Sequence, residues 1–223
     1  MTVAAVIVAA GSGQRLAAGI PKAMVALGDR PIVEWAVRAF SGHPDVVSLV
    51  VVAPRESVAA ISDCVAGRAA VVAGGATRQE SVDLGLAALS ADSELVLVHD
   101  AARPLVSQDV ISAVVAALRA GADAVIPVLP VVDTIKRVNG AAQVIGTVDR
   151  ADLRIVQTPQ GFRRDVLVAA HAGAKDRGVA DISDDAGLVE GIGRTVQTVP
   201  GDERTFKITT PYDLALANRL VAQ

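Results

Sequence analysis

Residues 3–16 read VAAVIVAAGSGQRL, and this stretch decides the fold. Residues 3–9 form a strand-length apolar run without polar alternation, which is typical of a parallel strand covered by helices on both faces. Glycines follow at Gly11 and Gly13, where the chain has to turn. In an open α/β sheet, ligands bind beyond the carboxyl ends of the strands. The stretch therefore predicts the first strand of such a sheet and one wall of a ligand site.

Similar apolar runs recur along the chain and alternate with amphipathic stretches. Strands are predicted at residues 3–9, 46–53, 69–73, 95–99 and 124–128. Helices are predicted at residues 31–41, 55–65, 77–90 and 107–120, the last with Ser107 as N-cap and Gly121 as stop. This alternation indicates an α/β fold with a doubly wound, mostly parallel sheet. The length is that of a single domain, residues 1–223.

The alternation stops at residue 129, where a β-hairpin is predicted. Residues 134–138 and 143–148 alternate as exposed strands do, and Asn139–Gly140 is a strong hairpin turn signal. We expect residues 129–155 to project as a β-arm. Because a two-stranded arm is marginal alone, we expect it to pack on a second copy of the chain, giving a homodimer. Helices at 163–177, 184–191 and 211–221 and a strand at 195–199 complete the predicted elements.

Composition excludes several classes of protein. The chain is 52% hydrophobic but only 2% aromatic, and its mean hydropathy is +0.45. No uncharged apolar run approaches the roughly 20 residues that a membrane span needs. The net charge of −3 and the scarcity of aromatics argue against nucleic-acid binding. The single cysteine, Cys64, rules out an intramolecular disulfide and fits a cytoplasmic location.

The glycine loop after the first strand is followed by two cations, Arg15 and Lys22. A P-loop would need Lys-Ser or Lys-Thr after the glycines, and a dinucleotide fingerprint would need Gly or Ala where Leu16 stands. Backbone amides at such a turn cradle phosphate oxygens. The loop therefore favours a triphosphate, and an ordinary strand-to-helix turn is the alternative.

Two further segments end predicted strands at the same edge of the sheet. Asp100 and Arg103 lie in His-Asp-Ala-Ala-Arg-Pro, where the carboxylate could hold sugar hydroxyls or a metal and the guanidinium an anion, unless the two simply pair with each other. We expect His99 to be a packing or hydrogen-bonding residue. Residues 74–81 read GGATRQES, which predicts a helix N-terminus that binds anions or base edges, with Thr77 and Glu80 as a capping box.

These segments together resemble one family. The motifs are Ala-Ala-Gly-x-Gly-x-Arg with Pro-Lys, Gly-Gly-x-x-Arg-x-x-Ser-Val, His-Asp-Ala-Ala-Arg-Pro, Asp-Thr-Ile-Lys, Val-Asp-Arg, Gln-Thr-Pro-Gln and Lys-Ile-Thr-x-Pro-x-Asp-Leu. The first is shared by many sugar-phosphate nucleotidyltransferases. The full set, which runs from residue 3 to residue 221, resembles the 2-C-methyl-D-erythritol 4-phosphate cytidylyltransferases of the non-mevalonate isoprenoid pathway.

The resemblance implies a Rossmann-like fold of the nucleotide-diphospho-sugar transferase type, with a β-arm that interlocks a homodimer. It implies transfer of CMP from CTP to the polyol phosphate with release of pyrophosphate. It also implies Mg²⁺, held mainly by the CTP phosphates, with Asp100 as the candidate protein ligand. The substrate phosphate itself attacks the α-phosphorus, so no protein nucleophile is needed, and the residues show no Ser-His-Asp arrangement.

The resemblance also assigns roles to residues. The catalytic cations are Arg15, Lys22 and Lys207. The residues that match CTP-binding positions are Ala10, Gly11, Gly13, Gly75, Ser81 and Asp100. The residues that match sugar-phosphate positions are Arg103, Thr134, Arg150, Thr158 and Ser183, with Thr134 and Arg150 reaching the neighbouring subunit's substrate.

The sequence departs from the family pattern at two positions. Ala76 stands where some members have Asp, so cytosine recognition there must rest on backbone groups, and Ser183 stands where some have Thr. Three alternatives stay open. One is an enzyme for ribitol 5-phosphate, the second is a nucleotide-binding regulatory protein without turnover, and the third is a glycosyltransferase. An Asp-x-Asp metal site, common in glycosyltransferases, does not occur at Asp100.

Overall fold

The computed structural model describes residues 1–11, 20–178 and 183–222. Its main sheet has the order β10-β7-β11-β6-β1-β4-β5, and β12 pairs with β7. The parallel part consists of β1 (Val3–Val8), β4 (Val46–Ala53), β5 (Ala70–Ala73), β6 (Leu95–Asp100), β7 (Ala124–Pro130) and β12 (Val196–Pro200). The predicted mostly parallel α/β sheet is confirmed.

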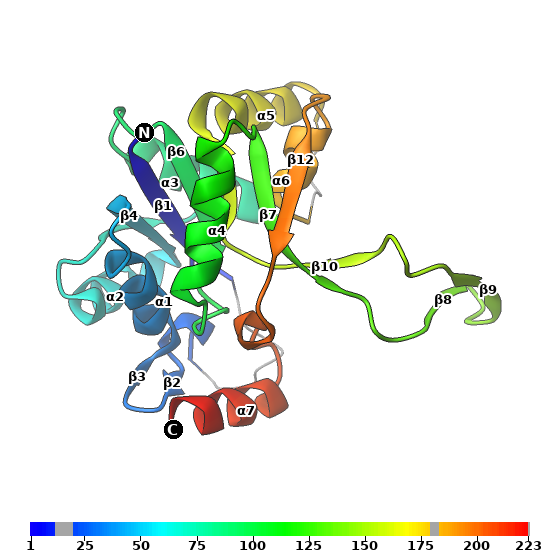
Figure 1. Ribbon diagram of the computed structural model, residues 1–223. Helices are drawn as coiled ribbons and strands as arrows, with labels where there is room; N and C mark the ends of the chain where they lie inside the picture. Colours follow the sequence, from blue (N-terminus) through cyan, green and yellow to red (C-terminus); the bar gives the residue numbers. More distant parts are fainter. Residues whose placement is uncertain (12–19, 179–182, 223) are drawn as a thin grey trace.

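Helices cover both faces of this sheet (Figure 1). One face carries α1 (Ile32–Ser41), α2 (Val58–Val65) and α4 (Gln108–Arg119), and the other carries α3 (Arg78–Ala88), α5 (Arg164–Asp176) and α6 (Asp185–Glu190). Within β1, Ala5 and Ile7 pack into the first layer and Ala4 and Val6 into the second. Burial on both faces explains why the strand shows no polar alternation.

A small hydrophobic cluster lies beside the carboxyl edge of the sheet and includes residues of the last helix of the described chain. It joins the short strands β2 (Ala26–Leu27) and β3 (Arg30–Pro31) to α7 (Pro211–Val221). In the described part of the chain, the 3-10 turns η2 (Lys22–Met24), η3 (Arg55–Ser57) and η4 (Glu203–Thr205) connect elements. The predicted helix at 55–65 is therefore split, because its first turn is η3. Among the described residues, no helix is long and apolar enough to cross a membrane.

Two antiparallel strands of the main sheet were not predicted. They are β10 (Arg154–Val156), beside β7, and β11 (Gln160–Arg163), between β6 and β7. The β11 segment reads QGFR, so it lacks the apolar run of a buried strand. Gly161 is required there because a Cβ would lie 2.4 Å from Val114 Cγ1. Gln160 is fully buried but bonds Asp184 and the Ala186 N–H.

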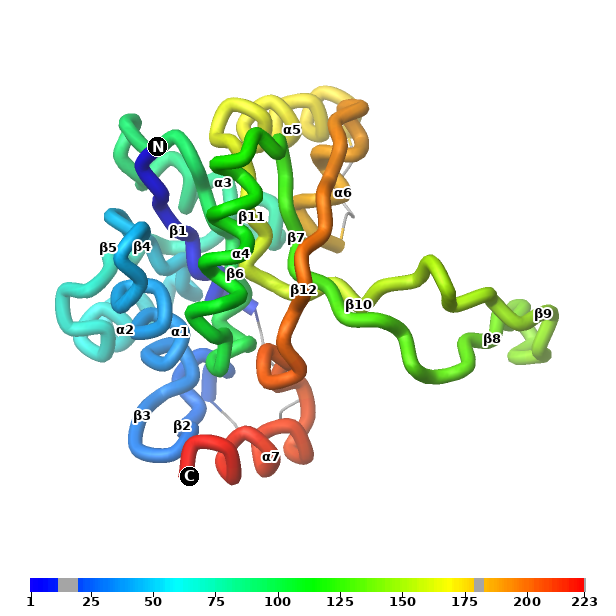
Figure 2. Tube along the Cα trace, viewed as in Figure 1, coloured from blue at the N-terminus to red at the C-terminus, as the bar shows by residue number. Residues whose placement is uncertain are grey.

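The predicted hairpin is present, with strands β8 (Ile135–Val138) and β9 (Val144–Val148) that pair with each other. It projects well away from the sheet (Figure 2). The turn is longer than a two-residue loop, because Val138 pairs with Val144. Asn139 Oδ1 accepts from the N–H groups of Ala141 and Gln143 at 3.0 Å, and this closes the loop.

Candidate active site

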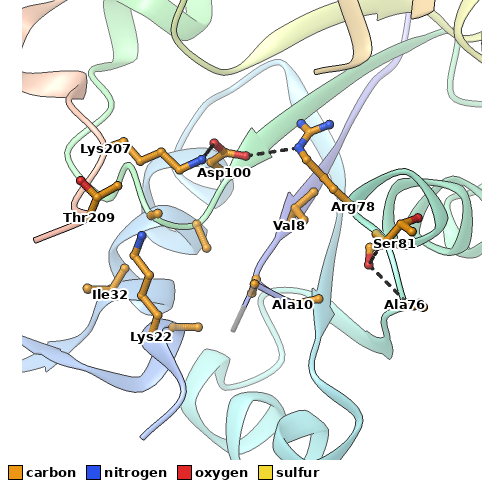
Figure 3. Close-up of a pocket in the computed structure, with 17 residues that line it drawn as sticks. Val8, Ala10, Lys22, Ile32, Ala76, Arg78, Ser81, Asp100, Lys207 and Thr209 are labelled. Atoms are coloured by element: carbon orange, nitrogen blue, oxygen red, sulfur yellow. Dashed lines mark hydrogen bonds and ion pairs between the residues drawn. The ribbon is translucent and has the colours of Figure 1, made fainter. Parts of the chain in front are cut away.

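A cavity of about 670 Å³ lies at the carboxyl ends of β1 and β6, where the sequence predicted a ligand site. Its wall is built by the end of β1, by η2, by the start of α3, by the tip of β6 and by the segment before α7 (Figure 3). The predicted site residues that line it are Ala10, Gly11, Lys22, Gly75, Ser81, Asp100 and Lys207. Segments that are distant in sequence therefore meet at one point.

Asp100 is the acidic residue of this wall, and it lies between two cations. Its Oδ2 accepts from Lys207 Nζ at 2.8 Å, and its Oδ1 lies 3.7 Å from Arg78 Nε (Figure 3). Only 14% of its side chain is exposed. Burial alone would raise its pKa, but the charges of Lys207 and Arg78 outweigh burial and lower the pKa to about 2. Asp100 is therefore a carboxylate at neutral pH.

Lys22 and Lys207 present their ammonium groups to the cavity from two different elements (Figure 3). Lys22 begins η2, directly after Pro21, whose carbonyl accepts from the Met24 N–H at 2.8 Å. Lys207 is fixed by its neighbour, because the Ile208 N–H donates to the Ala102 carbonyl at 2.8 Å. Two cations that converge on one cavity suit a ligand with several phosphate groups.

The loop before α3 forms the third part of the wall, and its predicted capping box is confirmed. Thr77 Oγ1 accepts from the Glu80 N–H at 3.1 Å, while Glu80 Oε2 accepts from the Thr77 N–H at 3.4 Å and from the Ala76 N–H at 2.7 Å. Ser81 Oγ accepts from the Gly75 N–H at 3.2 Å and donates to the Thr77 carbonyl at 2.9 Å. The cap therefore orders the loop, and it uses the N–H of Ala76, one of the backbone groups at this position.

Close packing against Glu80 explains why residue 75 is glycine. A Cβ at this position would lie 2.4 Å from Glu80 Cβ, which is a distance that side chains do not tolerate. The close approach of the loop to its own helix therefore depends on the absence of a side chain.

Arg103, Thr158 and His99 support the tip of β6 and are not among the described residues that line the cavity. Arg103 donates to the Thr205 carbonyl at 2.9 Å and to the Val156 carbonyl at 3.2 Å, and burial lowers its pKa. It therefore ties the arm's base to the segment before Lys207 and does not form the local pair with Asp100.

Thr158 Oγ1 lies 2.9 Å from His99 Nδ1 and accepts from the Asp100 N–H at 3.1 Å. His99 is fully buried, and burial lowers its pKa to about 4. It is a neutral hydrogen-bonding histidine at neutral pH, as predicted.

The remaining predicted residues are apart from the cavity or outside the described part of the chain. Thr134 precedes β8 and Arg150 follows β9, both on the exposed arm, where Arg150 Nη1 donates to the Val132 carbonyl. Ser183 is exposed next to the start of α6. Gly13 and Arg15 lie outside the residues that the structure describes.

Comparison with known proteins gives this site a family. The family model described as IspD, 2-C-methyl-D-erythritol 4-phosphate cytidylyltransferase, matches residues 3–223. The chain belongs to this family. A cytidylyltransferase of that name from Streptomyces avermitilis is 48% identical, covering 99% of this chain and 92% of the relative. A bifunctional IspD/IspF enzyme from Clavibacter michiganensis is 50% identical, covering 98% of this chain and 54% of the relative.

Solved cytidylyltransferases share the fold over the whole chain. The enzyme from Thermus thermophilus is 39% identical with a TM-score of 0.82, and each chain is covered completely. The synthase from Anaerococcus prevotii is 30% identical with a TM-score of 0.86, covering 100% of this chain and 99% of that one. The nucleotidyltransferase fold of this family is therefore the fold of the chain, and the chain is a cytidylyltransferase, an enzyme of the transferase class.

Among the described residues of this cytidylyltransferase wall, sequence reasoning missed one charged residue, Arg78. It lines the cavity and contacts Asp100 and also the buried Asp185. The signal was present, because Arg78 is the arginine of the Gly-Gly-x-x-Arg-x-x-Ser-Val motif. No role was assigned to it, because its acidic partners lie far away in the sequence.

The side chains that line the cavity can hold a divalent cation only together with oxygen atoms of a bound ligand. Among the described residues, no group of three or more His, Cys, Asp or Glu side chains could hold a metal, and Asp100 is the acidic residue of the lining. Mg²⁺ is commonly bound by one or two carboxylates together with substrate phosphates. The wall therefore suits a cation that is carried mainly by the phosphates of a nucleotide.

Proposed function

We propose that the chain transfers CMP from CTP to 2-C-methyl-D-erythritol 4-phosphate, giving 4-diphosphocytidyl-2-C-methyl-D-erythritol and pyrophosphate. One observation carries the proposal. Lys22, Asp100 and Lys207 meet at a single cavity at the strand ends, in a chain that matches this family over residues 3–223. The methylerythritol phosphate name of that family supports this substrate over ribitol 5-phosphate.

The reaction is a direct displacement at the α-phosphorus of CTP. A phosphate oxygen of the polyol phosphate forms the new bond to this phosphorus, and the bond from the phosphorus to the α,β-bridging oxygen breaks. Pyrophosphate leaves with that electron pair. Positioning and charge stabilisation supply most of the catalysis in phosphoryl transfer, so the protein needs no nucleophile.

The cations that line the cavity would stabilise the negative charge of the phosphates during the reaction. Lys22 and Lys207 would hold phosphate oxygens, and the predicted partner Arg15 would add a further positive charge. Lys207 already lies beside Asp100, so its ammonium group is oriented before the ligand arrives. Preorganised charges of this kind stabilise the transition state without reorganisation during the reaction.

We place Mg²⁺ with the CTP phosphates, where Asp100 is the one described lining residue with a carboxylate to offer. When bound, the cation would neutralise charge on the triphosphate and on the departing pyrophosphate. Asp100 would then exchange part of its contact with Lys207 for the cation, leaving the ammonium group to the phosphates.

We also propose that the arm forms a homodimer. Apolar arm residues are widely exposed, with Val132 at 73%, Val144 at 61% and Ile145 at 59%. A two-stranded hairpin with such a surface is marginal alone. Because the arm projects away from its own sheet (Figure 1), Thr134 and Arg150 would serve the substrate of the partner subunit. A monomeric mass in solution, measured by light scattering, would contradict this.

The function is tested with the purified chain, CTP and Mg²⁺, together with either methylerythritol phosphate or ribitol 5-phosphate, by following pyrophosphate. We expect release with methylerythritol phosphate. Release only with ribitol 5-phosphate would overturn the substrate, and no release with either would favour a regulatory nucleotide binder. The cytoplasmic location stays a prediction.

A further inference from the structure

Arg78 occupies a place between two carboxylates, one in the cavity wall and one in the interior. Its Nη1 lies 2.7 Å from Asp185 Oδ2, and its Nε lies 3.7 Å from Asp100 Oδ1. It is the first residue of α3, and 27% of its side chain is exposed. The guanidinium group is therefore held more closely by the interior carboxylate than by the one that faces the ligand.

Asp185 is a buried charge, since only 1% of its side chain is exposed. Burial alone would raise its pKa, but its hydrogen bond with His171 and the charge of Arg78 lower it. A buried ion pair is weak evidence for stability, because removing both ions from water costs about as much as the pairing returns. Stabilising the packing of α6 therefore does not explain why an ionised Asp185 is buried here.

His171 contacts the Asp185 oxygen that Arg78 leaves free. Its Nε2 lies 3.1 Å from Asp185 Oδ1, and its Nδ1 lies 2.7 Å from Asp83 Oδ1, at the distance of an ion pair. Lys175 Nζ lies 2.8 Å from the other oxygen of Asp83. Both ring nitrogens therefore lie close to carboxylates. The Asp185 carboxylate is thus fixed on one side by α5 and offered on the other side to Arg78.

We propose that Asp185 is a positioning residue for nucleotide binding, which holds the Arg78 guanidinium against Asp100 at the cavity wall. The inference rests on the proposed function, because it takes CTP as the ligand. Fixed by Asp185, Arg78 stays at the wall and shares Asp100 with Lys207, which keeps the carboxylate in one orientation. Without Asp185, the guanidinium group would no longer be held at this place, and Asp100 would lose one of the two cations that orient it.

The test compares Asp185→Asn, Arg78→Gln and the double variant by calorimetric titration with CTP and by steady-state kinetics. Loss of a buried charged hydrogen bond predicts that CTP affinity falls about 10-fold in Asp185→Asn. The KM for the polyol phosphate is expected to stay close to that of the wild type. Because Asp185 acts through Arg78, the double variant should bind CTP no more weakly than Arg78→Gln.

The matched control is Asp123→Asn. It removes another carboxylate that pairs with an arginine, Arg194, at 3.3 Å, and Asp123 is not among the described residues that line the cavity. This variant should bind CTP as the wild type does. Far-UV circular dichroism and the melting temperature of each variant separate misfolding from mispositioning.

Unchanged CTP affinity in a folded Asp185→Asn, or losses that multiply in the double variant, would overturn the inference. If Asp185→Asn does not fold, Arg78→Gln decides, since Arg78 is partly exposed. A folded Arg78→Gln with wild-type CTP affinity would also overturn it. CTP binding needs no turnover, so a wild type that binds CTP without releasing pyrophosphate would contradict the proposed function and leave this inference standing.

Discussion

Replacing Asp100 by Asn tests the electrostatics of the site through the stability of the fold. The amide has the size of the carboxyl group but no charge, so the variant resembles a wild type that is protonated at this position. The folded chain holds the pKa of Asp100 at about 2, against an ordinary value of 3.8. One pKa unit corresponds to about 1.4 kcal/mol. The ionised side chain therefore stabilises the fold by about 2 kcal/mol.

The pH dependence has a definite direction. Because the folded pKa is depressed, this stabilisation is present above pH 3.8 and is lost as the pH falls through about 2. Urea unfolding at pH 7 should show Asp100→Asn less stable than the wild type by about 2 kcal/mol. The difference should shrink as the pH is lowered from 4 towards 2.

Asp45→Asn is the control for this prediction. Asp45 also pairs with an arginine, Arg119, at 2.8 Å, but 33% of its side chain is exposed. Such surface pairs contribute little to stability, so Asp45→Asn should unfold almost as the wild type does. Equal stability of wild type and Asp100→Asn at pH 7 would refute the reasoning, and so would a difference that persists unchanged at pH 2.

Two further variants test the roles of single residues. Lys22→Ala should lower kcat about 10²- to 10³-fold with an unchanged melting temperature, because it removes a charge preorganised for the transition state; near-normal turnover would refute this role. Arg150→Ala should raise the KM for the polyol phosphate more than the KM for CTP. Co-expression of Arg150→Ala with Lys22→Ala chains should restore about a quarter of wild-type activity, because about half of the dimers are mixed and each mixed dimer has one complete site. Absence of restored activity in isolated mixed dimers would place Arg150 in its own subunit's site.

Hydrophobic patterning was enough to predict the parallel strands of the main sheet. Residues 3–8 are apolar at every position because β1 is covered on both faces, and the same pattern identified β4 and β6. It failed for β11, where Gln160 and Gly161 replace an apolar run. Their burial depends on contacts with α6 and α4, which local sequence does not encode.

The site residues also divide into those that local sequence predicts and those that only the fold brings together. The glycine loop and Asp100 could be predicted from their places after strands. Lys207 received its role only from the family resemblance, because its partner Asp100 is 107 residues away. The link from Arg78 to Asp185 spans another 107 residues, and only the fold brings these two side chains together.

The most direct test of the account is the stereochemical course at the α-phosphorus. CTP carrying sulfur at that phosphorus in one configuration would be turned over with methylerythritol phosphate, and the configuration of the product determined. A single displacement by the substrate phosphate, within a site that only positions and neutralises charge, predicts inversion. Retention would show two successive displacements through a covalent intermediate on the protein, and would contradict the account.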